Sequence, residues 1–130
     1  MSPETKIIAV ETLDAACLNS ALMEGKPVKL KSVGLFADGT AVAEIGGKTF
    51  SILKELVDDV VLVSTDEICA AIKDIYNEVR AICEPSGAMS LAGLKKFVSQ
   101  NAISKSSLIT IQCGANIDFD RLRYLSLIHI

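Results

Sequence analysis

Two short apolar runs that lie far apart in the chain constrain the fold most. Residues 6–10 (KIIAV) and 59–63 (DVVLV) hold consecutive β-branched side chains bounded by polar ones, which is typical of strands covered on both faces of a sheet. Between and after them, helical patterns cover residues 14–24, 48–56, 65–80 and 85–98, and a further strand is predicted at 107–112. This alternation predicts an α/β fold in which a mostly parallel sheet lies inside a three-layer αβα sandwich.

Several element ends carry their own signals. Ser64 and Glu67 are spaced as a capping box, in which each side chain bonds the other's backbone amide. Asp14 is expected in the first turn of the helix at 14–24, and Gly25 is placed to end that helix in the left-handed conformation. Residues 28–47 show no sustained period and are punctuated by glycine, so we interpret 34–42 as a functional or connecting loop.

Composition narrows the class of protein. The 13 basic residues are spread among 16 acidic ones, the net charge is −3 and only 5% of residues are aromatic, which argues against a nucleic-acid partner. Apolar runs are short and the N-terminus lacks the features of a signal peptide. We therefore expect one domain in the cytoplasm, with no membrane partner.

The four cysteines stand at wide spacings without a Cys-x-x-Cys pair, so we predict reduced thiols rather than a zinc or disulfide framework. Cys113 ends the strand predicted at 107–112, immediately before Gly114. Open α/β sheets bind ligands beyond the carboxyl ends of their strands, which makes Cys113 the first candidate site residue. The alternative is that Cys113 is a small buried core residue.

Glu84 and two glycines are further candidates. Glu84 precedes Pro85 at a predicted helix start, where a carboxylate is stabilised by unpaired amides and the helix dipole, so capping alone could explain it. Gly39 and Gly114 would let the backbone approach another group closely. Ordinary turn punctuation is the alternative for both glycines.

Four motifs in order along the chain resemble one family. They are residues 8–11 (IAVE), 34–42 (GLFADGTAV), 84–88 (EPSGA) and 113–124 (CGANIDFDRLRY). Together they are similar to the serine/threonine dehydratases and serine racemases, which are fold type II pyridoxal-phosphate enzymes. The last motif matches GANxxFxRLRY, a pattern more typical of the biosynthetic threonine dehydratases.

The resemblance implies that part of the family's machinery is missing. In this family a lysine in a Ser-x-Lys-x-Arg motif holds the cofactor as a Schiff base, and a run of glycines cradles its phosphate. This sequence contains neither motif. We therefore expect residues 1–124 to be the C-terminal half of the catalytic domain, with Met1 an internal methionine, no catalytic residue present and no activity alone.

The last six residues, 125–130 (LSLIHI), depart abruptly from the family. They are similar to the translation of a transposase adapter used in sequencing libraries, so we expect an adapter-derived tail. His129, the only histidine, belongs to it. The alternative is a natural frayed terminus, and neither interpretation makes His129 catalytic.

The resemblance also assigns roles to the candidate residues. Cys113 matches a serine or cysteine that faces the pyridine nitrogen of the cofactor, where a thiol leaves that nitrogen neutral and moderates the electron sink. Glu84 is implied to lie near the ring, where it can influence proton movement. Gly39 and Gly114 are implied to line the cofactor and substrate pocket. These four are the predicted cofactor-binding residues.

A metal site is not predicted. Glu11 matches a glutamate that in serine racemases helps to bind a divalent cation, together with a carbonyl at Ala15 and a carboxylate where this chain has Cys17. That substitution removes a hard oxygen ligand. We interpret Glu11 instead as a surface acid at a helix start.

The function implied is pyridoxal-phosphate-dependent conversion of threonine or serine to a 2-oxo acid and ammonia. For threonine the product is 2-oxobutanoate, in the first step of isoleucine biosynthesis. The complete enzyme is expected to be a homo-oligomer. Two alternatives remain: a serine racemase or catabolic serine/threonine dehydratase, told apart by an isoleucine-binding regulatory domain, and a non-catalytic module that binds an amino acid.

Overall fold

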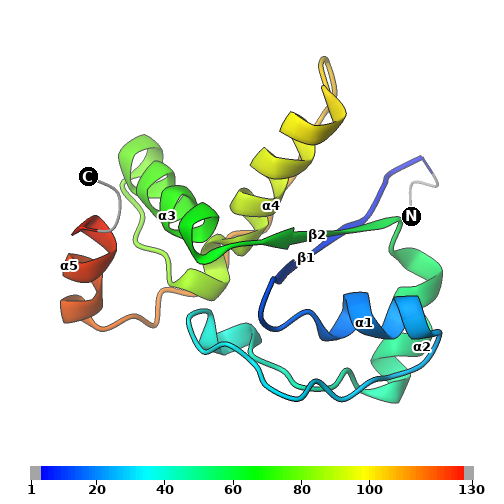
Figure 1. Ribbon diagram of the computed structural model, residues 1–130. Coiled ribbons are helices and arrows are strands. Elements are labelled where there is room, and N and C mark those ends of the chain that lie inside the picture. Colours follow the sequence, from blue (N-terminus) through cyan, green and yellow to red (C-terminus); the bar gives the residue numbers. More distant parts are fainter. Residues whose placement is uncertain (1–3, 128–130) are drawn as a thin grey trace.

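A short parallel sheet lies at the centre of the computed structural model, which describes residues 4–127 (Figure 1). Strands β1 (Ile8–Thr12) and β2 (Asp59–Val63) pair in parallel, with Ile8 opposite Asp59 and Thr12 opposite Val63. The second strand is the one predicted at 59–63. The first lies two residues later than predicted, because Ile8 is the first residue to pair with β2.

Helices cover both faces of this sheet. Figure 1 shows α3 (Thr65–Val79) and α4 (Pro85–Asn101) on one side, and α1 (Cys17–Glu24) and α2 (Gly47–Leu56) on the other. Successive side chains of β1 follow this arrangement, since Ile8 and Val10 pack towards α3 and α4 whereas Ala9 packs towards α1 and α2. The predicted three-layer αβα order with a parallel sheet is therefore confirmed.

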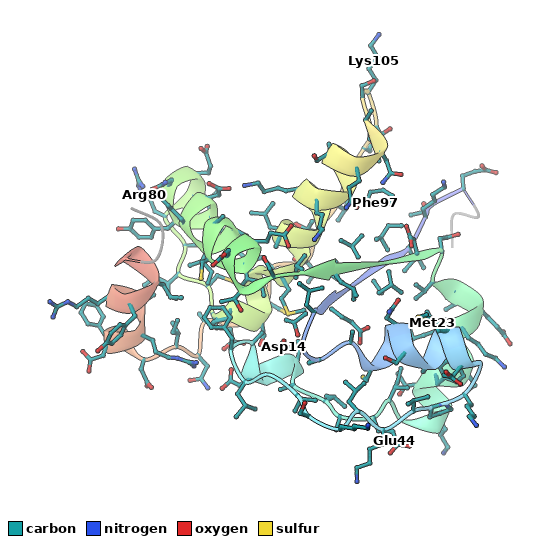
Figure 2. The ribbon with its side chains drawn as sticks, in the orientation of Figure 1. Asp14, Met23, Glu44, Arg80, Phe97 and Lys105 are labelled. Atoms are coloured by element: carbon teal, nitrogen blue, oxygen red, sulfur yellow. The ribbon has the colours of Figure 1, made fainter. Side chains whose placement is uncertain are left out.

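Each layer has its own apolar core. The larger core lies under α3 and α4, where Val63 and Ile68 are fully buried at 0% exposure. The smaller core lies under α1 and α2 and contains Cys17, Leu18, Ala21, Ile45 and Phe50. Met23 and Glu44 lie on the outside of this second layer (Figure 2).

Two of the predicted helix signals are confirmed. Ser64 Oγ accepts a hydrogen bond from the backbone N–H of Glu67 at 3.2 Å, and Glu67 Oε2 accepts one from the backbone N–H of Ser64 at 2.7 Å. Gly25 ends α1 with φ 70°. The helices predicted at 48–56, 65–80 and 85–98 are also present, with ends shifted by up to three residues.

The start predicted for α1 at Asp14 is wrong, because the helix begins at Cys17. Leu13 still donates its backbone N–H to the Val63 carbonyl at 3.0 Å, which keeps residue 13 beside the sheet. The first amides of the helix are capped from the preceding strand: Glu11 accepts the backbone N–H groups of Leu18 and Asn19, each at 2.8 Å. Glu11 thus takes the part expected of Asp14.

The strand predicted at 107–112 is also wrong. No strand of the described chain hydrogen-bonds to this segment, and its apolar side chains face outward, with Ile109 88% and Ile111 76% exposed. The segment runs back along α4 instead, where the Ser90 hydroxyl donates to the Ile111 carbonyl at 2.7 Å. A strand pattern becomes a strand only when another strand pairs with it.

Two elements lie outside the predicted set. The loop at 34–42 contains a short 3₁₀ turn, η1 (Asp38–Thr40), and the last element of the described residues is helix α5 (Phe119–Leu127), which includes residues 125–127 of the expected tail. His129 lies outside the described residues. Lys105 marks the tip of the connection beyond α4 (Figure 2). Within residues 4–127 no helix has the length and apolarity needed to cross a membrane.

Candidate functional site

Three segments that are distant in sequence meet where the parallel strands end. They are the loop at 37–39, the start of α4 at 84–87 and the turn at 113–116. Figure 1 shows η1 and the connection before α5 both beside the start of α4. Thr40 also joins η1 to α4, because its hydroxyl lies 3.2 Å from the sulfur of Met89. The carboxyl ends of parallel strands are the usual ligand side of such sheets.

Glu84 joins two of these segments. Its backbone N–H donates to the Gly114 carbonyl at 3.2 Å, and its Oε2 accepts a hydrogen bond from the Asn116 backbone N–H at 3.0 Å. Glu84 occupies the N-cap position before Pro85, but its side chain makes no hydrogen bond to the first turn of α4. The capping interpretation is therefore wrong for the carboxylate, which holds the turn at 114–116 instead.

Gly114 and Gly39 allow their loops to pack closely against the start of α4. A Cβ on Gly114 would lie 2.0 Å from Glu84 Oε1, and φ at Gly114 is +80°, which side chains disfavour. A Cβ on Gly39 would lie 2.9 Å from Ser86 Oγ and 3.8 Å from Glu84 Oε1. Turn punctuation alone does not explain these two glycines, because a side chain at either position would crowd the start of α4.

Gly87 and Ser86 are site residues that the sequence interpretation missed. A Cβ on Gly87 would lie 1.6 Å from the Cys113 carbonyl oxygen, so only glycine lets this turn rest against α4. A glycine inside a helix costs about 1 kcal/mol relative to alanine, so the position of Gly87 within the predicted helix was the signal that this residue has a special role. Ser86 Oγ is buried and has no hydrogen-bond partner among the described residues.

The two cysteines at the site differ in exposure. Cys113 is exposed, so the interpretation of Cys113 as a small buried core residue is wrong. Cys83 is fully buried at 0% exposure. Burial raises the pKa of the Cys83 thiol, and the nearby Cys113 and Glu84 raise it further, against an opposing hydrogen bond with Gln112. All four cysteines are free thiols, as predicted.

Glu11 and Cys17 form a structural contact. Both carboxylate oxygens of Glu11 are occupied by amides of α1, which confirms the helix-start interpretation. Cys17 is buried in the smaller core, and burial followed by the Glu11 carboxylate raises the pKa of its thiol. In residues 4–127 no group of three or more His, Cys, Asp or Glu side chains is arranged to hold a metal ion.

The cluster around Glu84 is a surface rather than a closed cavity. Two hollows of the described chain, with volumes of about 400 and 510 Å³, lie between α3 and α4 and beside residues 30–34. None of the predicted site residues lines either hollow. Gly39, Cys113 and Gly114 are exposed and Glu84 is half-buried, so the four residues lie on an open face of the described chain.

Comparison with known sequences identifies relatives for nearly the whole chain. Residues 1–114 match the family model described as pyridoxal-phosphate dependent enzyme. Biosynthetic L-threonine dehydratases of Pasteurella multocida and Escherichia coli are 56% and 50% identical to this chain over 126 residues, which is 97% of it. The same stretch is 25% and 24% of those proteins. The chain thus spans about a quarter of their length.

Solved structures give the same result. A processed form of threonine deaminase isoform 2 from Solanum lycopersicum superposes with a TM-score of 0.95 at 44% identity, over 98% of this chain and 37% of that one. Maize serine racemase superposes with a TM-score of 0.83 at 32% identity, over 99% of this chain and 41% of that one. Together with the family match and the predicted fold, these similarities show that the chain belongs to the pyridoxal-phosphate-dependent enzymes.

Proposed function

We propose that this chain is part of a lyase that uses pyridoxal phosphate to convert L-threonine to 2-oxobutanoate and ammonia, the first step of isoleucine biosynthesis. The meeting of Gly39, Glu84 and Gly114 at one surface is the structural observation that carries the proposal. The 50–56% identity to proteins named as biosynthetic threonine dehydratases supports this substrate. L-serine, which lacks only the methyl group, is the second substrate to test.

This surface is the part of the chain that we assign to the cofactor. Gly39 and Gly114 let two loops pack closely against Glu84 and Ser86 at the start of α4, which brings the candidate residues together. Cys113 is exposed next to Gly114, and Ser86 contributes a buried hydroxyl without a partner among the described residues. When bound, pyridoxal phosphate supplies the electron sink for the charge left by removal of the substrate's α-proton.

Cys113 tunes that sink in this proposal. A carboxylate facing a pyridine nitrogen would hold a proton on it, whereas a neutral thiol offers a weak hydrogen bond and no charge. In this proposal Cys113 would lie beside the ring nitrogen without placing a charge there, and so would moderate the electron sink that the cofactor supplies. The exposure of Cys113 in the described chain is compatible with this contact.

Glu84 orients the surface. Its Oε2 is fixed by the Asn116 amide, and its Oε1 lies where the backbones of Gly39 and Gly114 approach it. A carboxylate held in this way can keep the turn at 114–116 in place and can accept a proton at Oε1. We assign both parts to Glu84.

The remaining assignments belong to the same proposal. Residues 1–124 are assigned to the catalytic domain, and the lysine and phosphate loop of the family come from other parts of the enzyme. We place the enzyme in the cytoplasm as a homo-oligomer with small-molecule partners.

A chimaeric enzyme tests the proposal. Residues 1–124 replace the matching stretch of the Pasteurella multocida threonine dehydratase, and formation of 2-oxobutanoate from threonine is measured. We expect turnover, and we expect Glu84→Gln to lower kcat/KM by at least about tenfold, which corresponds to about 1.4 kcal/mol. Glu44→Gln, an exposed change in the other layer, is the matched control (Figure 2).

The results of this experiment test the proposed activity and the role of Glu84 separately. A chimaera that folds and binds pyridoxal phosphate but forms no 2-oxobutanoate contradicts the proposed activity. Equal losses of kcat/KM in the Glu84→Gln and Glu44→Gln variants would contradict the role proposed for Glu84. The 130-residue chain itself, assayed with added pyridoxal phosphate, is expected to show no threonine turnover.

A further inference from the structure

Cys83 and Cys113 are in contact across Gly87. The Cys83 sulfur lies 4.0 Å from the Cys113 carbonyl oxygen. A Cβ on Gly87 would lie 1.6 Å from that oxygen and 2.7 Å from the Cys83 sulfur. The missing side chain of Gly87 is therefore what allows the backbone at residue 113 to come within one side-chain length of the buried sulfur.

The two thiols are unequal in a way that suits stepwise oxidation. Cys113 is exposed and is therefore the thiol that an oxidant in solvent meets first. Cys83 is fully buried beneath it. A buried thiol of this kind is shielded from solvent oxidants, and its raised pKa slows its attack on another sulfur, so the second step depends on the two sulfurs being held together.

The backbone around Cys113 has to move for the two sulfurs to meet. Residue 113 lies in a connection without helix or strand hydrogen bonds, between the end of α4 and the start of α5. Gly114, the next residue, has φ +80° and no side chain to restrict rotation. The disulfide requires rotation of the Cys113 side chain together with movement of this connection, which Glu84 and Ser90 hold by hydrogen bonds on either side of residue 113.

We propose that Cys113 is an oxidation site and that a peroxide converts it, with Cys83, into an intramolecular disulfide. The Cys113 sulfur attacks the peroxide, the O–O bond breaks, and a sulfenic acid and one water form. The Cys83 sulfur then attacks the Cys113 sulfur, so that an S–S bond forms, the S–O bond breaks and a second water leaves. Two thiols lose two hydrogens in total, and one hydrogen peroxide becomes two waters.

The disulfide would act on the proposed cofactor surface. If the proposed function holds, oxidation would remove the free thiol that we assign to the cofactor surface and would shift the turn that Glu84 holds. A dithiol reductant reverses the change. The bond itself forms whether or not the chain binds a cofactor, so its test needs none.

Peptide mapping of this chain tests the proposal. The four cysteines fall in different tryptic peptides, and those of Cys83 and Cys113 are residues 81–95 and 106–121. The folded chain is treated with hydrogen peroxide, digested without reduction and analysed by mass spectrometry. We expect one dominant cross-linked pair, 81–95 with 106–121, lighter by two hydrogens and removed by dithiothreitol.

Variants and a denatured sample provide the controls. Cys17→Ser and Cys69→Ser are matched changes that should leave the cross-link intact, whereas Cys83→Ala should abolish it and leave Cys113 as a sulfenic or sulfinic acid. In guanidinium chloride the preference for Cys83 should disappear. Dominant cross-links to Cys17 or Cys69 in the folded chain, or oxidised Cys113 without a cross-link in the unsubstituted chain, would overturn the proposal.

A failed cross-link leaves the proposed lyase activity untouched. The chimaera can turn over threonine with Cys83 and Cys113 never joining. Equally, the cross-link can form in a chain whose chimaera is inactive.

Discussion

Gly87→Ala tests whether the site depends on close backbone contact. The new methyl group would lie 1.6 Å from the Cys113 carbonyl oxygen and 2.7 Å from the Cys83 sulfur. Neither distance can be accommodated, and the nearer atom belongs to the backbone, which cannot rotate out of the way. The turn at 113–116 must therefore move off α4.

The expected cost follows from the bonds that this movement breaks. The hydrogen bond from the Glu84 N–H to the Gly114 carbonyl contributes about 1 kcal/mol, and the Asn116 N–H bond to the Glu84 carboxylate contributes about 1.5–3 kcal/mol. Replacing a helical glycine by alanine stabilises the helix by about 1 kcal/mol. The net loss in the free energy of unfolding is therefore about 1.5–3 kcal/mol.

Urea unfolding followed by circular dichroism measures this loss, and hydrogen exchange at the Asn116 amide locates it. Gly47→Ala is the matched control, because nothing lies within 4 Å of a Cβ there. That change should stabilise the chain by about 0.4–1 kcal/mol. A Gly87→Ala chain as stable as the original, with the Asn116 amide still protected, would refute the contact between the turn and α4.

Three further predictions concern α3. Ser64→Ala should lower the free energy of unfolding by about 1 kcal/mol through loss of the capping box, measured in urea, whereas Thr65→Ala, at an exposed neighbour, should change it by less than about 0.5 kcal/mol. Ile68→Ala should cost about 2–5 kcal/mol, because Ile68 is 0% exposed; a loss under 1 kcal/mol would mean that this core is not packed as described. Partial burial alone would raise the pKa of Glu67, but the Ser64 backbone N–H and the Lys96 ammonium together lower it below its usual value. The ionised Glu67 carboxylate therefore stabilises the fold above its unfolded-state pKa of about 4.3, and this stabilisation is lost as the pH falls through the lower folded-state pKa. When the free energy of unfolding is measured at falling pH, the Glu67→Gln chain should lose less stability than the original chain. Equal losses in the two chains would contradict this role of Glu67.

The elements that the sequence predicted correctly either depend on groups within the element itself or have a pairing partner in the described chain. The capping box needs residues three apart, and Gly25 needs only its own backbone freedom. Strand 59–63 has a partner, β1, within the described chain, and both faces of the sheet are covered. Patterns of this kind are readable because the groups that stabilise them lie nearby or follow a short period.

The errors share a dependence on groups outside the predicted element. The start of α1 is set by the Glu11 carboxylate in the preceding strand, and no pattern at Asp14 reports that contact. The strand expected at 107–112 has the right composition but no pairing partner in the described chain. An apolar run predicts that a segment can form a strand, not that another strand will pair with it.

The candidate site was predicted in part for the same reason. Gly39, Glu84, Cys113 and Gly114 stood out because family motifs carry them. Ser86 and Gly87 belong to the same motif, yet their parts appear only when the Gly39 loop and the Cys113 carbonyl are seen against α4. A close approach between segments leaves no periodic signal in either one.

Binding of an aldehyde-free cofactor analogue tests the central claim most directly. Pyridoxine 5′-phosphate, which cannot react with lysines, is titrated into the isotope-labelled chain while backbone amide resonances are recorded. The account predicts saturable shifts at Gly39, Gly114 and Asn116, with weak affinity of about 1 mM, or roughly −4 kcal/mol, and no shift at Gly46 or Gly47. Unchanged resonances at the first three residues, or equal shifts at all five, would contradict it.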